Sequence, residues 1–170
     1  KAAQRLIAEI ESSVDGSLRI MEFCGGHTHA IMRYGIRQAL APAVRLLSGP
    51  GCPVCVTADL DIDRAIALAH LPDVVVTTFG DMMRVPGSRQ SLQEAKSQGA
   101  DVRMVYSALD AVKLAQDHPD RQVVMLGIGF ETTAPTVAAS LQHARRLDLQ
   151  NYLVYSMHKL TAPAMRAILD

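Results

Sequence analysis

Short apolar runs, separated by longer stretches with helical spacing, constrain the fold of this 170-residue chain more than any other feature. The runs are rich in β-branched residues and almost continuously apolar, which is typical of strands covered on both faces. The pattern predicts an α/β fold, with a Rossmann-like parallel sheet flanked by helices. The expected strands are Leu18–Phe23, Val44–Ser48, Val74–Phe79, Val102–Tyr106, Val123–Ile128 and Tyr152–Tyr155. The expected helices are Ala2–Val14, Thr28–Ala41, Asp59–Leu71, Ser91–Ser97, Ala108–Asp117, Thr133–Leu147 and Ala162–Leu169.

A polar turn around Pro119 and Asp120 is the best candidate for a domain boundary. Residues 1–118 are expected to form a first α/β domain that carries the cysteine and histidine motifs. Residues 119–170 are expected to be the opening units of a second, similar α/β domain, which is truncated. The chain starts at Lys and stops within a helical pattern, so we expect a fragment of a longer protein.

Charge and composition argue against two classes of partner. Lys and Arg number 17 and Asp and Glu also 17, so the formal net charge is +0 and the footprint of a nucleic-acid or anionic-membrane binder is absent. Aromatic residues make up 4% of the chain, and no apolar run approaches the roughly 20 residues of a membrane span. We therefore expect a cytoplasmic protein with no nucleic-acid or membrane partner. Three cysteines, an odd number, suit metal or redox chemistry in a reducing compartment better than a disulfide framework.

All three cysteines fall in the loops that follow the first two expected strands. The first loop is Cys24-Gly25-Gly26-His27-Thr28-His29, and the second runs from Gly49 to Cys55 with the sequence Gly-Pro-Gly-Cys-Pro-Val-Cys. Loops that follow parallel strands emerge at one edge of a sheet, where open α/β sheets bind ligands. The sequence therefore predicts a site at this edge.

The Cys-x-x-Cys spacing of Cys52 and Cys55 permits several uses. Both sulfurs can face one metal ion, or they can bond to each other as in thioredoxin-like redox chemistry. A helix beginning at this segment would favour the thiolate form through its positive dipole end. The alternative is two ordinary small apolar residues beside a turn.

Cys24 and the residues after it combine a thiol, two glycines and two imidazoles. Gly25 and Gly26 allow the backbone to approach a ligand closely or to take positive φ angles. Thiolate and imidazole are ligands favoured by iron, zinc and copper, so Cys24 and His27 are candidate metal ligands. The alternatives are histidines bonded to the helix start and Thr28 acting as its N-cap.

The segment from Gly129 to Pro135 follows the fifth expected strand and has the sequence Gly-Phe-Glu-Thr-Thr-Ala-Pro. Its amides could hold an anion, but it lacks the lysine and the spacing of a P-loop. Glu131 is a candidate acid, base or ligand-orienting group, or else Glu131 and Thr132 cap a helix with Pro135 in its first turn. Asp81 and His158 follow other expected strands and are more typical of ordinary polar loop residues.

These three segments, in this order, resemble the HypD family of hydrogenase maturation factors. The resemblance covers the whole chain and corresponds to the amino-terminal half of the family's length. It implies a scaffold that holds iron while the Fe(CN)2CO centre of [NiFe]-hydrogenases is assembled, together with a HypC-like chaperone and a HypE-like cyanide donor. It thus implies a metal-centre assembly scaffold with redox-active thiols, carrying carbon monoxide and cyanide ligands on iron, and not a conventional turnover enzyme.

The resemblance also implies a role for each matching residue. Cys24 would ligate the iron, and His27 would bind it directly or hydrogen-bond beside it. Gly25 and Gly26 would contact the bound group. Cys52 and Cys55 would form the redox-active pair. The residues expected to line the cleft facing Cys24 are Glu131, Thr132 and Thr133.

One departure from the family concerns its [4Fe-4S] cluster, which is carried by cysteines near the family's carboxyl terminus. Three cysteines cannot fill a site that needs four thiolates, so we expect these residues alone not to complete maturation. Two other functions remain open on the residues themselves. One is a thiol–disulfide oxidoreductase in which Cys24 is incidental. The other is a structural zinc site built from Cys24, Cys52, Cys55 and His27.

Overall fold

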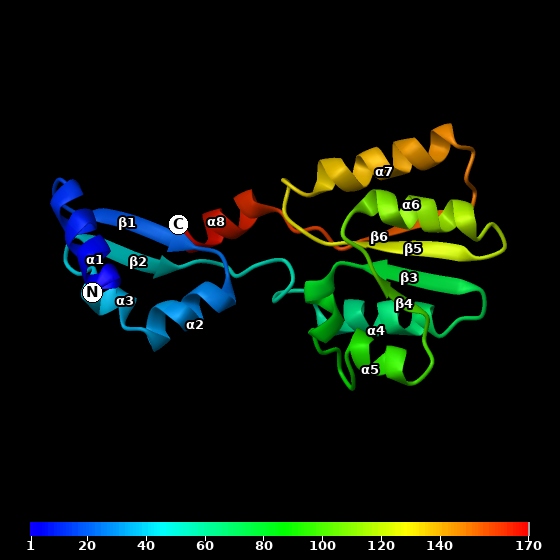
Figure 1. The fold of residues 1–170 in the computed structure, drawn as a ribbon, viewed down its shortest axis with the longest axis horizontal. Helices are drawn as coiled ribbons and strands as arrows, with labels where there is room; N and C mark the ends of the chain where they lie inside the picture. The colour runs from blue at the N-terminus through cyan, green and yellow to red at the C-terminus, as the bar shows by residue number, and fades with distance from the viewer. Residues whose placement is uncertain (170) are drawn as a thin grey trace. The chain divides into compact units, whose positions relative to one another are not determined.

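The strands of the chain form two parallel sheets, and the division between the sheets falls after the second strand instead of near residue 119. Figure 1 shows the computed structural model, which describes residues 1–169. The chain divides into two units. Unit 1 comprises Lys1–Cys55 and the chain from Ala162 onward, and unit 2 comprises Val56–Thr161. The expected mixed α/β class with parallel sheets flanked by helices is confirmed.

Unit 1 is built on a two-stranded parallel sheet. Strand β1 pairs with β2 in a register that runs from Leu18↔Val44 to Glu22↔Ser48. Gly35 has a left-handed φ of 64°, and this position divides the single helix expected over Thr28–Ala41 into two. The elements of unit 1 are α1 (Ala2–Ser13), β1 (Leu18–Glu22), α2 (Gly25–Arg33), α3 (Ile36–Ala39), β2 (Val44–Ser48) and α8 (Thr161–Leu169), which belongs to this unit from Ala162.

Few side chains are buried in unit 1. Among its described residues, Leu40 and Val44 are the buried hydrophobic side chains. Helices α1, α2 and α3 have no buried residue. Burial of apolar surface is the main favourable term in folding, so this unit carries a small share of the protein's hydrophobic stabilisation.

Unit 2 contains a four-stranded parallel sheet with the order β4-β3-β5-β6. Helices α4 and α5 cover one face and α6 and α7 cover the other (Figure 1). Two helices begin with capping boxes, Ser91 with Glu94 and Ser107 with Asp110. The elements are α4 (Asp59–Ala69), β3 (Val74–Thr78), the 3-10 helix η1 (Gly80–Arg84), α5 (Leu92–Ser97), β4 (Val102–Met104), α6 (Ala108–Asp117), β5 (Gln122–Gly127), α7 (Ala134–Arg146) and β6 (Tyr152–Ser156).

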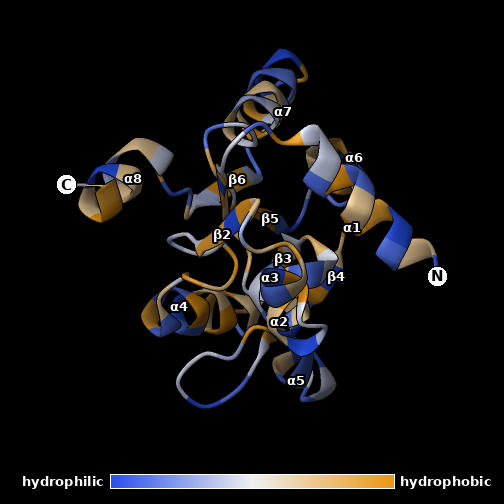
Figure 2. Ribbon diagram, turned by 90° about the vertical axis from the view of Figure 1, so that its left-hand side faces the viewer, coloured by the Kyte–Doolittle hydropathy of each residue, from blue (hydrophilic) through white to orange (hydrophobic). Residues whose placement is uncertain are grey.

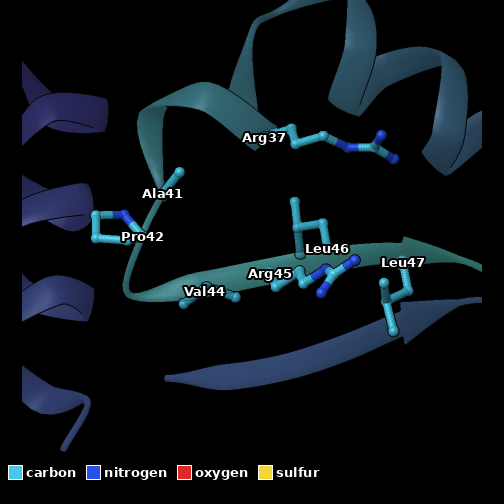
Figure 3. Close-up of a pocket in the computed structure, with 7 residues that line it drawn as sticks. All are labelled: Arg37, Ala41, Pro42, Val44, Arg45, Leu46 and Leu47. Atoms are coloured by element: carbon cyan, nitrogen blue, oxygen red, sulfur yellow. The ribbon is translucent and has the colours of Figure 1, made fainter. Parts of the chain in front are cut away.

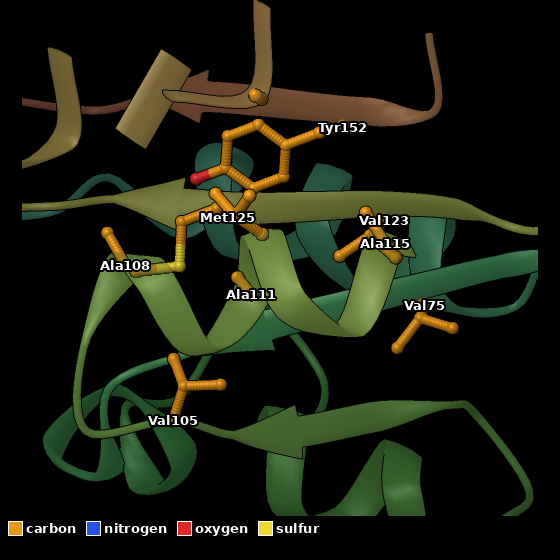
Figure 4. Packing of buried hydrophobic residues seen from close by; sticks show 10 residues of the cluster. Val75, Val105, Ala108, Ala111, Ala115, Val123, Met125 and Tyr152 are labelled. Atoms are coloured by element: carbon orange, nitrogen blue, oxygen red, sulfur yellow. The ribbon is translucent and has the colours of Figure 1, made fainter. Parts of the chain in front are cut away.

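The hydrophobic core of unit 2 explains its all-parallel sheet. Every residue of β3 is buried, as expected for a strand covered on both faces. Alanines of α6 let the helix approach the sheet, where they pack on Val123, Met125 and Tyr152 (Figure 4). Helices α4 and α6 carry both hydrophobic and hydrophilic residues along their length (Figure 2), as helices that cover a sheet must.

The boundary expected between residues 118 and 119 falls inside unit 2. The strand that follows it, β5, pairs with β3 from Val74↔Gln122 to Thr77↔Met125, and β6 pairs with β5. Residues 119–161 therefore complete the sheet of this unit and do not open a second domain. The polar turn is held to that sheet by Asn151, whose Nδ2 donates to the backbone carbonyls of Ala115, His118 and Arg121 at 2.9, 3.0 and 2.9 Å.

No helix within residues 1–169 combines the length and apolar character that crossing a membrane requires.

Candidate functional site

The ends of β1 and β2 bring the three cysteines to one edge of the sheet in unit 1. The last residues of the two strands, Glu22 and Ser48, are paired in register, and the Gly49 amide donates to the Glu22 carbonyl at 2.8 Å. A Cβ at position 49 would lie 2.6 Å from that carbonyl oxygen, so only glycine permits this approach. The two cysteine-bearing loops consequently leave the sheet side by side.

Cys52 and Cys55 are free thiols in close contact. Their Sγ atoms are 3.2 Å apart, and the Cys55 amide donates to Cys52 Sγ at 3.3 Å. Residues 53–56 form a turn and α4 begins at Asp59, so the helix start considered for this segment does not occur there. The adjacent Cys52 sulfur, then burial and the charge of Cys24, raise the pKa of Cys55, while the Gly25 amide opposes them. The protonated thiol of Cys55 is thereby favoured.

Cys24 is the N-cap residue of α2, with an extended backbone (φ −141°, ψ 121°). Gly25 and Gly26 form the first turn of the helix, and neither takes the positive φ that the sequence allowed. A Cβ at Gly25 would be 3.9 Å from Cys55 Sγ, and one at Gly26 would be 3.6 Å from Cys24 Sγ. The sulfurs of Cys24 and Cys55 therefore both lie against the first turn of α2.

Glu22 is a residue of this site that the sequence analysis missed. Its Oε2 accepts the Cys24 amide at 2.8 Å, and its Oε1 accepts the Thr28 hydroxyl. The hydrogen bond from Thr28 lowers the pKa of Glu22 most, followed by the Cys24 amide, with smaller contributions from Ser48 and the charge of His27. The only signal in the sequence is an acidic residue at a strand end, two positions before Cys24.

One alternative for Thr28 was that it is the N-cap residue of α2, and the structure contradicts this. The helix begins three residues earlier, at Gly25, and the Thr28 hydroxyl points back to Glu22. His27 and His29 are exposed residues of the same helix. His27 lies in the first turn of α2, three positions after the N-cap residue Cys24.

The sequence predicts Cys24 and His27 as metal ligands. Within residues 1–169 there is no group of three or more His, Cys, Asp or Glu side chains placed to hold a metal ion. A tetrahedral set of Cys24, Cys52, Cys55 and His27 is thus not assembled in this structure. The assignment of Cys24 and His27 as iron ligands stays a prediction.

Glu131, Thr132 and Thr133 belong to unit 2. The Glu131 carboxylate accepts the Thr161 amide at 2.8 Å and the Thr161 hydroxyl at 2.7 Å, at the start of α8. Thr133 is the N-cap residue of α7 but makes no side-chain cap, and Pro135 lies in the first turn as expected. The expected position of these residues opposite Cys24 stays a prediction.

Asp81 and His158 have local partners in unit 2. Asp81 Oδ1 accepts the Met82 amide at 3.0 Å, within η1. His158 Nδ1 lies 2.9 Å from Ser156 Oγ, and burial lowers the pKa of His158. Both contacts are those of ordinary loop residues that follow a strand.

A pocket of about 410 Å³ lies in unit 1, between α3 and β2 (Figure 3). Apolar side chains and two arginines line it, and no cysteine is among its lining residues. The pocket is therefore distinct from the cysteine-bearing edge. The residues that line it are Arg37, Ala41, Pro42, Val44, Arg45, Leu46 and Leu47.

Comparison with known proteins identifies a family that the chain matches. The family model HypD, described as "Hydrogenase formation hypA family", matches residues 1–170. A hydrogenase maturation factor HypD of Azotobacter vinelandii is 54% identical over 170 residues, which cover 98% of this chain and 45% of that protein. The factor of Cupriavidus necator is 50% identical over 99% of this chain and 45% of its own length. The factor of Escherichia coli K12 is 49% identical over 96% of this chain and 44% of its own length. The chain spans less than half the length of these relatives.

Proposed function

Because the chain belongs to the HypD family of hydrogenase formation proteins, we propose that it holds iron at Cys24 during assembly of the Fe(CN)2CO centre of a [NiFe]-hydrogenase. The iron is cargo here, delivered onward with its diatomic ligands. The observation that carries the proposal is the gathering of three thiols and an imidazole-bearing helix turn at the paired ends of β1 and β2.

The chemistry of this donor set suits the cargo. Cyanide and carbon monoxide bind an electron-rich iron, and a thiolate is a strong donor to such a centre. Cys24 and His27 supply two protein donors at most, which leaves coordination positions open for the diatomic ligands. His27 either ligates the iron or donates a hydrogen bond beside it, and the second role is the more conservative assignment.

Cys52 and Cys55 are proposed as the redox-active pair beside the iron. Their oxidation forms one S–S bond, releases two thiol protons and passes two electrons to an acceptor, and reduction reverses each change. The 3.2 Å contact of the two sulfurs supports this role. All three cysteines of the chain lie in this cluster, so the four thiolates of a [4Fe-4S] partner come from another part of the longer protein.

The proposed partners come from the family to which the chain belongs. A HypC-like chaperone forms a complex with the protein while the iron is held, and a HypE-like protein donates the cyanide. We also place the protein in the cytoplasm, because reducing conditions there keep the three thiols available.

Infrared spectroscopy of the full-length protein, purified anaerobically with its HypC-like partner, tests the proposal. Cyanide and carbonyl ligands on iron absorb where protein does not. We expect these bands in the native protein and in the control His29→Ala, weaker bands in His27→Ala, and none in Cys24→Ala. Bands of native intensity in Cys24→Ala would refute the assignment of the iron to this residue.

A thiol–disulfide oxidoreductase is the second candidate, favoured by the contact of Cys52 and Cys55. It predicts that Cys24→Ala retains full disulfide-exchange activity, and that the native protein with its partner shows no cyanide or carbonyl bands. The same two samples therefore separate the two functions.

A further inference from the structure

Glu22 connects the three segments that carry the site. It ends β1, pairs in register with the last residue of β2, and reaches the first turns of α2 with its carboxylate. One oxygen accepts the Cys24 amide and the other accepts the Thr28 hydroxyl. Ser48 at the end of β2 also contributes to lowering the pKa of this carboxylate.

The two oxygens of Glu22 bind the chain at two places, the amide of Cys24 and the side chain of Thr28 four residues later. The bond to the Cys24 amide fixes the backbone immediately before the helix, and Thr28 closes the turn after it, because its own amide donates to the Cys24 carbonyl at 3.0 Å. Cys24 is thus held from its amide, from its carbonyl and through the first turn of α2. The backbone that carries the Cys24 thiol is therefore fixed on both sides of the residue.

The same residue fixes the second cysteine loop. The Glu22 carbonyl accepts the Gly49 amide at 2.8 Å, at the start of the segment that leads to Cys52 and Cys55. The backbone of Glu22 therefore positions one loop while its side chain positions the other.

We propose that Glu22 is a positioning residue that holds the Cys24 thiol in reach of the Cys52–Cys55 pair. The reason for placing the thiols together rests on the proposed function. The inference itself concerns only the relative positions of the sulfur atoms. Glu22 itself touches no cargo. Its contribution is geometric, through hydrogen bonds that a glutamine in its place would largely keep.

The test uses the full-length protein in a Cys52→Ser background, so that Cys24 and Cys55 are the only thiols left at this edge. Dibromobimane, a short reagent that bridges two neighbouring thiols, reports their proximity, and peptide mass spectrometry identifies the bridged pair. Glu22→Ala removes both side-chain hydrogen bonds, and each such bond is worth about fivefold in an equilibrium. We therefore expect the rate of Cys24–Cys55 bridging to fall by about tenfold or more.

Three matched variants make the result specific. Glu22→Gln keeps an acceptor for the Cys24 amide and a polar group for Thr28, so its bridging rate should stay within about threefold of the parent. Thr28→Val, of nearly identical shape, removes the hydroxyl that donates to Glu22 and lies 3.4 Å from the Cys24 carbonyl, but keeps the bond of Glu22 to the Cys24 amide. It should give an intermediate rate even if Glu22→Ala folds poorly. Glu94→Ala removes a comparable carboxylate cap from α5 in unit 2 and should leave the bridging rate unchanged.

Several results would overturn the inference. They are native bridging in both Glu22→Ala and Thr28→Val, equal losses in Glu22→Gln and Glu22→Ala, or an equal loss in Glu94→Ala. The first shows that the bonds do not position the thiol, the second that charge matters and not hydrogen bonding, and the third that general stability is responsible. The bridging assay contains no iron, so the proposed function can fail in the infrared experiment while this inference stands, and the reverse also holds.

Discussion

Replacing Gly49 with alanine should separate the two cysteine loops. Gly49 is not in the left-handed region of backbone conformation, so the effect of alanine is one of space alone. The new Cβ would lie 2.6 Å from the Glu22 carbonyl oxygen, and 3.1 and 3.2 Å from Cγ and Sδ of Met21. The Met21 side chain can rotate away. The carbonyl cannot, because it accepts the Gly49 amide at 2.8 Å.

The cost follows from these contacts. Overpacking against a fixed backbone atom costs about 1–3 kcal/mol, and the weakened hydrogen bond adds about 1 kcal/mol. Alanine also lowers the entropy of the unfolded chain, an offset of about 0.4–1 kcal/mol that leaves the sign unchanged. We expect a loss of roughly 2–3 kcal/mol in the free energy that keeps the ends of β1 and β2 paired.

Hydrogen exchange measured by mass spectrometry on the peptides that contain β1 and β2 reports this loss locally. At 1.4 kcal/mol per tenfold change, protection should fall by roughly 30- to 150-fold. Gly26→Ala is the matched control, since its Cβ would meet only Cys24 Sγ at an ordinary 3.6 Å. Native protection in Gly49→Ala would refute the reasoning, and so would an equal loss in Gly26→Ala.

Three further predictions concern single residues. Asn151→Leu removes the amide that serves three buried or half-buried carbonyls, so urea unfolding should show a loss of about 2–4 kcal/mol, and a loss below about 1 kcal/mol would contradict this account. Cys52→Ser removes the main cause of the raised pKa of Cys55, so the pH midpoint of Cys55 alkylation by iodoacetamide should move to lower pH, whereas an unchanged or higher midpoint would be inconsistent with the geometry. A hydrogen bond from Arg103 is the main cause that lowers the pKa of Asp101, so the ionised carboxylate stabilises the fold above about pH 4 and this contribution is lost as the pH falls through the lowered pKa. Asp101→Asn should therefore flatten the dependence of unfolding free energy on pH below about pH 4, and identical slopes in the two proteins would exclude this role.

The strands could be predicted from the sequence because a strand buried on both faces is a nearly continuous run of apolar residues. Each expected strand is present, with ends that differ by at most two residues, and the run from Val74 to Thr78 is buried throughout. Helices were also found at their expected places. The exception was the stretch from Thr28 to Ala41, where a single glycine at φ 64° ends one helix and starts another.

The pairing of the strands could not be predicted in the same way. Whether β5 joins β3 or begins a new sheet depends on contacts between residues nearly 50 positions apart, such as Val75 and Val123. A polar turn at Pro119 looks the same in either case. The division after Cys55, in contrast, coincides with no change in composition that a sequence pattern would register.

The site was partly visible in the sequence. Cys24, Cys52 and Cys55 stand out by residue type, and the rule that parallel strands end at one edge correctly brought them together. Glu22 was missed because a glutamate at a strand end is common, and its importance lies in two hydrogen bonds that only the fold creates. Glu131 stands out in the sequence as a charged residue in the loop after β5, but its hydrogen bonds to Thr161, 30 residues away, have no local sequence signature.

The scarcity of buried side chains in unit 1 couples occupancy of its cysteine edge to the order of the whole unit. A segment with little buried apolar surface opens at low free-energy cost, and any species that binds only the closed form stabilises that form by RT ln(1 + [L]/Kd). At a hundredfold excess over the dissociation constant this term is about 2.7 kcal/mol, comparable with the loss expected for Gly49→Ala. Binding at the edge would then raise the hydrogen-exchange protection of β1, β2 and α2, and release would lower it, with the protection of unit 2 as an internal reference. A partner that senses the rigidity of unit 1 would in this way distinguish the occupied from the unoccupied edge without contacting the bound species.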